Sequence, residues 1–477
     1  MNFKTLFLNI AGTGDIADFP VSIVTSDSKK AVKNSVFVCI VGTRADGHDY
    51  AEAALASGAG AVVTARDMGL ENQIMVDDTR MVYALLCASF FGYPAKRLKL
   101  VGVTGTNGKT STTYILKQIL EASGIKTGLI GTIQNMIGSK SLEAVHTTPG
   151  AYELQSLFRS MADEGCEYVV MEVSSHALDQ GRVAGCRFQT AVFLNLTEEH
   201  LDYHGDMDSY AEAKEKLFSM CGTAVVNIDD PYAQRMIEHA VCDVKRFSVV
   251  SSADYTVSNV CEYPDGAEFL FSDSCLSARV RLRIPGLFSV YNSVAAGVAA
   301  LSLGIPFSAV TDAMNGVTCV KGRVEVVPTG RDFTVIIDYA HTPDGLENVL
   351  GTLKNTTDGR LVALFGCGGD RDRQKRPVMG EIAARLADFV IVTSDNPRSE
   401  NPSEIIREIL VGMDSTATPY EVIENRAEAV KYAVKSALPG DVVLLAGKGH
   451  ETYQILGDGT IHLDEREVVR DALNEAV

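Results

Sequence analysis

Short apolar runs rich in β-branched residues alternate along this chain with amphipathic helical patterns. Such alternation is typical of parallel sheets whose strands are joined by helices. Polar residues follow most of the runs, so they are expected at the carboxyl edge of each sheet, where open α/β folds bind ligands. We therefore predict an α/β protein. The expected strands lie at residues 36–41, 61–64, 100–103, 168–171, 191–194, 224–226, 335–337, 361–365, 389–392 and 442–445.

A chain of 477 residues is too long for one ordinary hydrophobic core. We predict three α/β domains. Residues 1–90 form a small domain, and residues 91–325 form a central domain with a phosphate loop and a parallel sheet. Residues 326–477 form a Rossmann-like C-terminal domain. A linker is expected near residues 91–94, where Gly and Pro interrupt the pattern.

Composition and charge exclude several classes of protein. The net charge of -18 argues against a nucleic-acid partner. The longest apolar stretch, residues 294–303, is too short to insert in a membrane. The first residues lack the apolar region of a signal peptide. The ten cysteines include no Cys-x-x-Cys pair, which predicts reduced core thiols in a cytoplasmic protein rather than disulfides or a zinc site.

A glycine-rich turn with a Gly-Lys-Thr triplet lies between the expected strand at 100–103 and an amphipathic helix. Its glycines can turn backbone N–H groups inward, Lys109 can reach terminal phosphates, and Thr110 can ligate Mg²⁺. We predict nucleotide binding, although Val103 stands where the full Walker spacing has glycine, which leaves an ordinary turn open. A kinase or motor is also open on the loop alone. The loop comprises Gly105, Thr106, Asn107, Gly108, Lys109, Thr110 and Ser111.

Residues 104–110 resemble the ATP loop of the Mur ligase family. Further similar segments follow in the family's order at 171–176, 195–202, 210–218, 292, 322–323, 338–343 and 447–451. The resemblance is strongest to the branch that adds the third amino acid to a nucleotide-linked muramyl dipeptide. It implies an ATP-dependent ligase for cell-wall peptidoglycan that joins meso-diaminopimelate to UDP-N-acetylmuramoyl-L-alanyl-D-glutamate through an acyl phosphate. We expect a monomer.

The resemblance assigns catalysis to Lys109, Glu172, His200 and Lys214. It places Mg²⁺ on Thr110, Glu172, His200 and Lys214, the lysine being converted by CO₂ to N6-carboxylysine because an ammonium cannot ligate a cation. Taken singly, Glu172 can be a solvated loop carboxylate, Lys214 a surface lysine in helical contacts, and His200 a helix-start histidine. Further ATP contacts are implied at Asn292, Arg323 and Asp338, with a hinge near 322–330. Asp338 can instead be the N-cap of the next helix.

The resemblance also implies the contacts of the nucleotide-linked acceptor. They are Ser28, Thr43, Arg44, Ala45, His146, Thr147, Thr148, Ser174, Gln180 and Arg182. Three positions depart from the family pattern. Lys29 stands in place of the usual Arg, Asn34-Ser35 in place of the usual Gly-Asp, and His146 in place of the more common Asn. A surface turn is the alternative for the segment around Ser28.

The diaminopimelate contacts implied by the resemblance are Arg371, Asp395, Asn396, Pro397, Arg398, Gly447 and Glu451. Diaminopimelate carries one carboxylate more than lysine, and the Arg398 guanidinium can hold it with two hydrogen bonds. Asp-Asn-Pro-Arg taken alone can be a plain turn.

Three alternatives stay open for the whole protein: the same ligase using L-lysine, a ligase like folylpolyglutamate synthetase, and a nucleotide-gated scaffold without chemistry.

Overall fold

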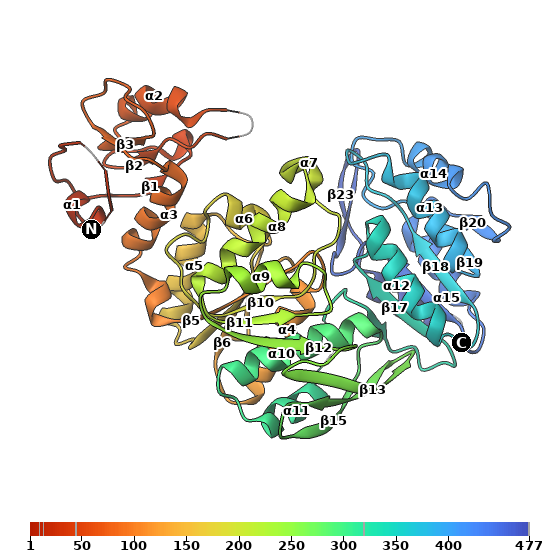
Figure 1. Ribbon diagram of the computed structural model, residues 1–477. Helices are drawn as coiled ribbons and strands as arrows, with labels where there is room; N and C mark the ends of the chain where they lie inside the picture. The colour runs from red at the N-terminus through yellow and green to blue at the C-terminus, as the bar shows by residue number, and fades with distance from the viewer. Residues whose placement is uncertain (9, 13, 43–44, 318–319, 476–477) are drawn as a thin grey trace. The chain divides into compact units, whose positions relative to one another are not determined.

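The computed structural model describes residues 1–477 except 9, 13, 43–44, 318–319 and 476–477. The chain divides into two compact units, which are Met1–Thr256 with Val294–Val310, and Val257–Ser293 with Thr311–Val477. Figure 1 colours the chain from red at the N-terminus to blue at the C-terminus, so the segments can be followed by residue number. Each unit is described by itself below.

The first unit begins with a four-stranded parallel sheet of order β1-β2-β3-β4. Its strands are β1 (Val24–Thr25), β2 (Val36–Val38), β3 (Ala61–Thr64) and β4 (Gln73–Met75). β2 and β3 are entirely buried, and Val36 pairs with Ala61. Asp78 begins α3 by accepting hydrogen bonds from the N–H groups of Arg80 and Met81. The helical segments are α1 (Phe3–Leu6), η1 (Ser28–Lys30), η2 (Gly47–Tyr50), α2 (Ala51–Ala56), α3 (Thr79–Phe90) and η3 (Pro94–Arg97).

A larger sheet follows, in the order β12-β11-β10-β5-β9-β6-β7-β8 within this unit. β5 lies between β9 and β10 and runs parallel to both, pairing Val103 with Glu172 and Thr104 with Phe193. The carboxyl ends of these strands therefore meet at one edge. The strands are β5 (Lys99–Thr104), β6 (Thr127–Ile130), β7 (Asn135–Ile137), β8 (Lys140–Leu142), β9 (Tyr168–Glu172), β10 (Phe188–Phe193), β11 (Cys221–Asn227) and β12 (Asp243–Ser248).

Helix α4 illustrates why the helices lie on this sheet. Its residues Ile115, Leu116, Ile119 and Leu120 recur at helical spacing and are all fully buried, as the sequence predicts. The other helical segments of the unit are α5 (Ala151–Asp163), α6 (Ser175–Asp179), α7 (Leu201–His204), α8 (Met207–Glu215), η4 (Lys216–Met220) and α9 (Ala233–His239), with α4 spanning Lys109–Ala122.

The second unit contains three strands in the sheet order β13-β14-β15, of which β14 and β15 pair in antiparallel fashion. They are β13 (Tyr255–Tyr263), which begins in the first unit, β14 (Gly266–Ser272) and β15 (Ser277–Leu282). The helices α10 (Leu287–Ser302), which ends in the first unit, and α11 (Phe307–Asn315) follow them.

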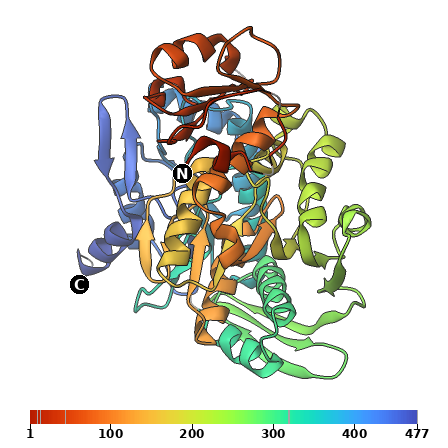
Figure 2. The same cartoon turned by 90° about the vertical axis from the view of Figure 1, so that its left-hand side faces the viewer.

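The second unit also contains a six-stranded sheet of order β16-β17-β21-β18-β19-β20. β16 is its antiparallel edge strand, and the other pairs are parallel. Figure 2 shows the two-stranded hairpin of β22 (Tyr453–Leu456) and β23 (Gly459–His462) in blue. The remaining elements are β16 (Glu325–Val327), β17 (Thr334–Asp338), α12 (Pro343–Thr356), β18 (Leu361–Phe365), α13 (Lys375–Leu386), β19 (Phe389–Val392), α14 (Pro402–Val411), β20 (Tyr420–Val422), α15 (Arg426–Lys435), β21 (Val442–Ala446) and α16 (Glu465–Glu475).

The predicted α/β class is confirmed, and most expected strands agree with the structure to within a residue. The strands expected at 191–194 and 224–226 begin three residues earlier, at Phe188 and Cys221, and the run at 36–41 forms a strand only over Val36–Val38. The expectation that all cysteines are core thiols is wrong. Cys261 and Cys275 are exposed, because they lie in the exposed strand β13 and in the β14–β15 turn. Among the described residues, no helix is both long enough and apolar enough to cross a membrane.

Candidate active site

The phosphate loop connects the buried strand β5 to α4. Gly108 occupies the position before the helix with a left-handed φ of 85°, a conformation that glycine adopts without strain. The Lys109 ammonium folds over the loop and donates hydrogen bonds to the carbonyls of Gly105 (2.8 Å) and Thr106 (2.7 Å). The loop backbone thus curls around a lysine at a helix N-terminus, the arrangement that favours phosphate groups.

Asn195 holds this loop in place and was not assigned a role from the sequence. Its Oδ1 accepts a hydrogen bond from the Asn107 N–H at 2.9 Å, and its Nδ2 donates to the Asn107 carbonyl at 3.2 Å. Asn195 follows β10, the strand next to β5. The signal that identifies it is its place at the tip of a neighbouring parallel strand.

Glu172 ends β9 and is only 1% exposed, so the alternative of a solvated loop carboxylate is wrong. Its Oε2 accepts hydrogen bonds from the hydroxyls of Thr110 (3.1 Å) and Thr132 (3.0 Å), and its Oε1 accepts from the Thr132 N–H (2.8 Å). A Cβ at residue 131 would lie 2.4 Å from this carboxylate, which explains Gly131. Thr132 escaped the sequence prediction because the short run before it, β6, was not recognised as a strand.

Lys214 is 1% exposed, so the alternative of a surface lysine is wrong as well. Its ammonium donates a hydrogen bond of 2.9 Å to the Gly105 carbonyl, which Lys109 also uses. The amine lies 4.6 Å from the centre of the Tyr210 ring. Burial, and then the charge of Lys109, hold the pKa of Lys214 well below its usual value of 10.5. The site therefore favours the neutral amine, which is the form able to react with CO₂.

His200 precedes α7 with a left-handed φ of 58° and is 43% exposed on its side chain. It therefore has the helix-start position of the simpler alternative, and its role as a metal ligand stays a prediction. Its Nε2 lies 3.8 Å from the Glu199 carboxylate, and its ring centre lies 5.0 Å from that of His176. Burial, and then the charges of Lys109 and Lys214, lower the pKa of His200.

A divalent cation fits part of the predicted ligand set. The Thr110 hydroxyl and the Glu172 carboxylate are adjacent hard oxygen donors of the kind that Mg²⁺ prefers. Within the described ranges, no group of three or more His, Cys, Asp or Glu side chains comes together as a metal cluster. Mg²⁺ bound beside phosphates usually takes few protein ligands.

The predicted acceptor residues of the larger sheet form one hydrogen-bonded network. Arg182 donates to the Thr148 carbonyl at 2.8 Å and, from two nitrogens, to Gln180 Oε1 at 3.1 and 2.7 Å. Thr148 Oγ1 donates to the Glu172 carbonyl at 2.9 Å and accepts from the Ser174 N–H at 3.0 Å. The network therefore reaches the backbone of the proposed metal ligand.

The remaining acceptor residues of this region lie differently. The hydroxyls of Thr147 and Thr132 are 3.0 Å apart, whereas His146 is exposed.

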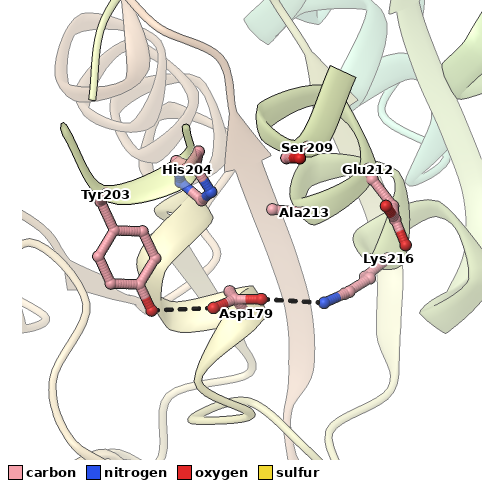
Figure 3. Close-up of a pocket in the computed structure, with 7 residues that line it drawn as sticks. All are labelled: Asp179, Tyr203, His204, Ser209, Glu212, Ala213 and Lys216. Carbon is pink, nitrogen blue, oxygen red and sulfur yellow. Dashed lines mark hydrogen bonds and ion pairs between the residues drawn. The ribbon is translucent and has the colours of Figure 1, made fainter. Parts of the chain in front are cut away.

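A polar pocket of about 350 Å³ lies at the other end of this network (Figure 3). Asp179 accepts a hydrogen bond from the Tyr203 hydroxyl (2.8 Å) and pairs with Lys216 (3.3 Å). Gln180 Nε2 donates to the same Tyr203 hydroxyl at 3.2 Å. Tyr203 thus links the pocket to the acceptor residues, although no sequence pattern indicates this role. His204, Ser209, Glu212 and Ala213 complete the lining.

In the N-terminal sheet, Ser28 is half-buried at the start of η1, where Asp27 accepts a hydrogen bond from the Lys29 N–H at 3.0 Å. The segment is a turn, and the uridine contact of Ser28 stays a prediction. Ala45 accepts a hydrogen bond from the Gly42 N–H at 2.9 Å, which closes the predicted uridine loop. Thr43 and Arg44 lie outside the described residues.

In the second unit, the Asp395–Arg398 segment is fixed by its neighbours rather than being a free turn. The Asn396 Oδ1 accepts from the Ile455 N–H at 2.9 Å, and the Asn396 Nδ2 donates to Glu451 Oε2 at 3.0 Å. Gly447 has φ 110°, and a Cβ there would lie 2.7 Å from the Asp395 carboxylate, so a side chain is excluded. Pro397 is buried. The structure thus brings Asp395, Asn396, Gly447 and Glu451 together.

Arg398 adopts a left-handed φ of 53° and donates a hydrogen bond to the Gly369 carbonyl at 2.8 Å. Gly369 lies two residues before the predicted contact Arg371, which is exposed. Fully buried Arg376 braces both segments through ion pairs with Glu400 (2.8 Å) and Glu408 (2.7 Å). The pair of Arg376 with Glu400 links the segment that follows Arg371 to the segment that follows Arg398.

Asp338 is not the N-cap of the following helix, so that alternative is wrong. Thr342 caps α12 by accepting from the Gly345 N–H. Asp338 is buried and instead accepts hydrogen bonds from the N–H groups of Val324 and Ala340, each at 2.7 Å. The Arg323 guanidinium lies 5.0 Å from the centre of the Tyr339 ring. Asn292 is buried within α10.

Together, a phosphate loop, a strand-tip carboxylate and a separate Rossmann-like sheet define a multidomain nucleotide-binding α/β protein. Family profiles match it in three segments, described as "Mur ligase family, catalytic domain" over residues 20–87, "Mur ligase middle domain" over 103–300, and "Mur ligase, glutamate ligase domain" over 322–449. The chain belongs to the Mur ligase family and has its three-domain architecture.

The relatives are similar over nearly their full length. A UDP-N-acetylmuramoyl-L-alanyl-D-glutamate--2,6-diaminopimelate ligase of Caldanaerobacter subterraneus is 50% identical, across 96% of this chain and 95% of that protein. A solved structure of a ligase with the same name has a TM-score of 0.73 at 34% identity, covering 96% of this chain and 95% of that one. Folylpolyglutamate synthase of Mycobacterium tuberculosis, solved with ADP and AMPPCP, shares only the fold. Its TM-score is 0.63 at 19% identity, and it covers 77% of this chain and 92% of that one.

Proposed function

We propose that this protein joins meso-diaminopimelate to the D-glutamyl γ-carboxylate of UDP-N-acetylmuramoyl-L-alanyl-D-glutamate, using ATP and Mg²⁺. It does so as a cytoplasmic monomer in peptidoglycan synthesis, with domains over residues 1–90, 91–325 and 326–477. The observation that carries the proposal is the buried Glu172 carboxylate, bonded to Thr110 of the phosphate loop and joined through its own carbonyl to the acceptor network. The names of the full-length relatives supply the substrates.

The proposed reaction has two steps. The γ-carboxylate attacks the γ-phosphorus of ATP, and ADP leaves. The amine of diaminopimelate then attacks the acyl carbon, loses a proton and expels phosphate. The negative charge that gathers on the phosphoryl oxygens needs cations held in fixed positions. Lys109 supplies one. Thr110, Glu172, His200 and Lys214, the last as N6-carboxylysine, would hold magnesium that neutralises phosphate charge. The remaining residues position the two reactants.

Arg182, with Thr148, Ser174 and Gln180, holds the acceptor in this scheme. Arg182 is prepared for a carboxylate or phosphate by the hydrogen bonds that orient its guanidinium. Ser28 and the loop of Thr43, Arg44 and Ala45 bind the uridine nucleotide, together with His146 and Thr147 nearer the peptide. Asn292, Arg323 and Asp338 complete the ATP contacts.

Carboxylation of Lys214 gives the first prediction. Lys214→Ala should lower turnover by about 10²- to 10³-fold, because the carbamate oxygen that helps hold the metal is lost. Acetate or propionate should restore part of the activity by supplying a carboxylate, whereas propylamine should not. The measurement is ADP release with and without each additive. Lys354→Ala, which alters an exposed lysine of α12 paired with Asp388, is the control and should retain activity.

Rescue of Lys214→Ala by propylamine but not by acetate would contradict this prediction, because the side chain would then act as an ammonium.

The function itself is tested with the purified protein, ATP, Mg²⁺ and the muramyl dipeptide. We expect ADP release and a tripeptide product, detected by mass, only when diaminopimelate is added. Equal product from L-lysine would favour the lysine-adding alternative. ADP release with a folate acceptor in place of the muramyl dipeptide would favour the folylpolyglutamate alternative. Nucleotide binding without ADP release would favour the scaffold alternative and reject the proposal.

A further inference from the structure

Lys448 is a fully buried lysine to which the mechanism above gives no role. It follows β21 and has 0% relative exposure. Lysine is seldom fully buried unless its charge is paired. Here the ammonium donates hydrogen bonds to Glu451 Oε2 at 2.6 Å and to Asn396 Oδ1 at 2.9 Å. Both partners belong to the proposed diaminopimelate site.

The hydrogen bonds of Lys448 fix which way the Asn396 amide faces. An ammonium and a backbone N–H can only donate, so the atom that faces both Lys448 and the Ile455 N–H must be the carbonyl oxygen Oδ1. Nδ2 then points to Glu451 Oε2, to which it donates at 3.0 Å. Rotating the amide by half a turn would place an NH₂ group against two donors.

Lys448 also orients Glu451. Oε2 accepts hydrogen bonds from both Lys448 and Asn396, which turns the other oxygen, Oε1, away from these two donors. The Glu451 side chain is 13% exposed, so part of it reaches the surface of the site. A carboxylate placed in this way suits an ammonium group of an incoming amino acid. The positive charge of Lys448 also balances the buried end of that carboxylate.

We infer that Lys448 is a positioning residue for the amino-acid substrate, acting through Asn396 and Glu451 without touching the substrate. This inference rests on the proposed function, because it concerns the amine that the ligase adds. In this inference, the buried Lys448 ammonium orients the Asn396 amide and the Glu451 carboxylate. Such a residue should affect binding of the amino acid and leave the ATP and muramyl dipeptide sites unchanged.

The test compares wild type with Lys448→Met, which removes the ammonium but keeps an unbranched side chain. We expect the KM for diaminopimelate to rise by about 10- to 100-fold, since a charged hydrogen-bond pair is lost. We expect kcat and the KM values for ATP and the dipeptide to stay within about twofold. Lys435→Met, which removes the ion pair of an exposed lysine with Glu475, is the matched control.

A half-reaction separates positioning from folding. Without amino acid, the acyl phosphate can be trapped with hydroxylamine as a hydroxamate, and Lys448→Met should form it at the wild-type rate. If Lys448→Met does not fold, Lys448→Gln, which keeps a donor on a shorter side chain, should show a smaller selective rise in KM. In a double-mutant cycle, Lys448→Met should add little to Asn396→Ala, because both act through one amide.

The outcomes are distinguishable. A KM for diaminopimelate that stays at the wild-type value would overturn the inference, as would a hydroxamate rate that falls with every other rate. Failure of the wild type to use diaminopimelate at all would instead overturn the proposed function.

Discussion

Arg398→Ala should remove the preference for diaminopimelate over lysine. Wild type is expected to favour diaminopimelate by about 10³-fold or more in kcat/KM, because a site built around a charged partner rejects the analogue that lacks it. The Arg398 guanidinium is held by the Gly369 carbonyl in a left-handed backbone turn, so its position is set before substrate arrives. The variant should bring the two amino acids within about tenfold, mainly by losing diaminopimelate activity.

The measurement is kcat/KM for both amino acids in wild type, Arg398→Ala and Arg398→Lys. Lysine at 398 keeps the charge but cannot make two parallel hydrogen bonds, so its selectivity should be intermediate. Arg407→Ala, an exposed arginine of α14, should behave as wild type. If Arg398→Ala kept the full preference, the extra carboxylate would have to be recognised elsewhere.

Glu172→Gln should nearly abolish turnover while leaving the fold intact. The amide has the shape of the carboxylate but lacks its charge. Its nitrogen cannot accept a hydrogen bond, so either the two hydroxyl bonds at Oε2 or the Thr132 N–H bond at Oε1 is lost. A magnesium ion would lose its only buried carboxylate among the proposed ligands. We expect kcat to fall by about 10²- to 10³-fold, as for loss of one electrostatic group in a closed site.

Thermal unfolding and ADP release together check the Glu172 prediction. The unfolding temperature should change by only a few degrees, because both side chains fill the same space. Glu164→Gln, which changes an exposed glutamate beyond α5, serves as the control and should not alter turnover. Wild-type turnover in Glu172→Gln would show that this carboxylate does not take part in phosphoryl transfer.

The sequence predicted the parallel strands because they are buried on both faces and therefore apolar throughout, as in β9 and β18. It did not reveal β13, β14 and β15. In β14, the buried Phe269 and Phe271 alternate with the half-buried Glu268 and Leu270, and the continuous apolar run is only three residues long. That alternation is typical of antiparallel strands and was the signal to follow.

Within the candidate site, the sequence located the residues at strand tips and in loops but not their supports. The supporting roles depend on contacts between segments far apart in the chain, which no local sequence pattern indicates. This is the case for Thr132, Asn195 and Lys448. The burial of Lys214 has the same origin. Its charge-rich helix is typical of an exposed surface, yet the fold turns this one lysine onto the phosphate loop.

The central claim is that ATP activates the D-glutamyl γ-carboxylate. The transfer of an oxygen atom from this carboxylate to phosphate tests it most directly. The D-glutamyl γ-carboxylate of the muramyl dipeptide is labelled with ¹⁸O, and the phosphate released during ligation is analysed by mass. If the carboxylate attacks the γ-phosphorus, each phosphate carries one ¹⁸O atom, because the acyl phosphate breaks at its carbon–oxygen bond. Unlabelled phosphate, formed while labelled dipeptide is consumed, would contradict activation of the acid by ATP.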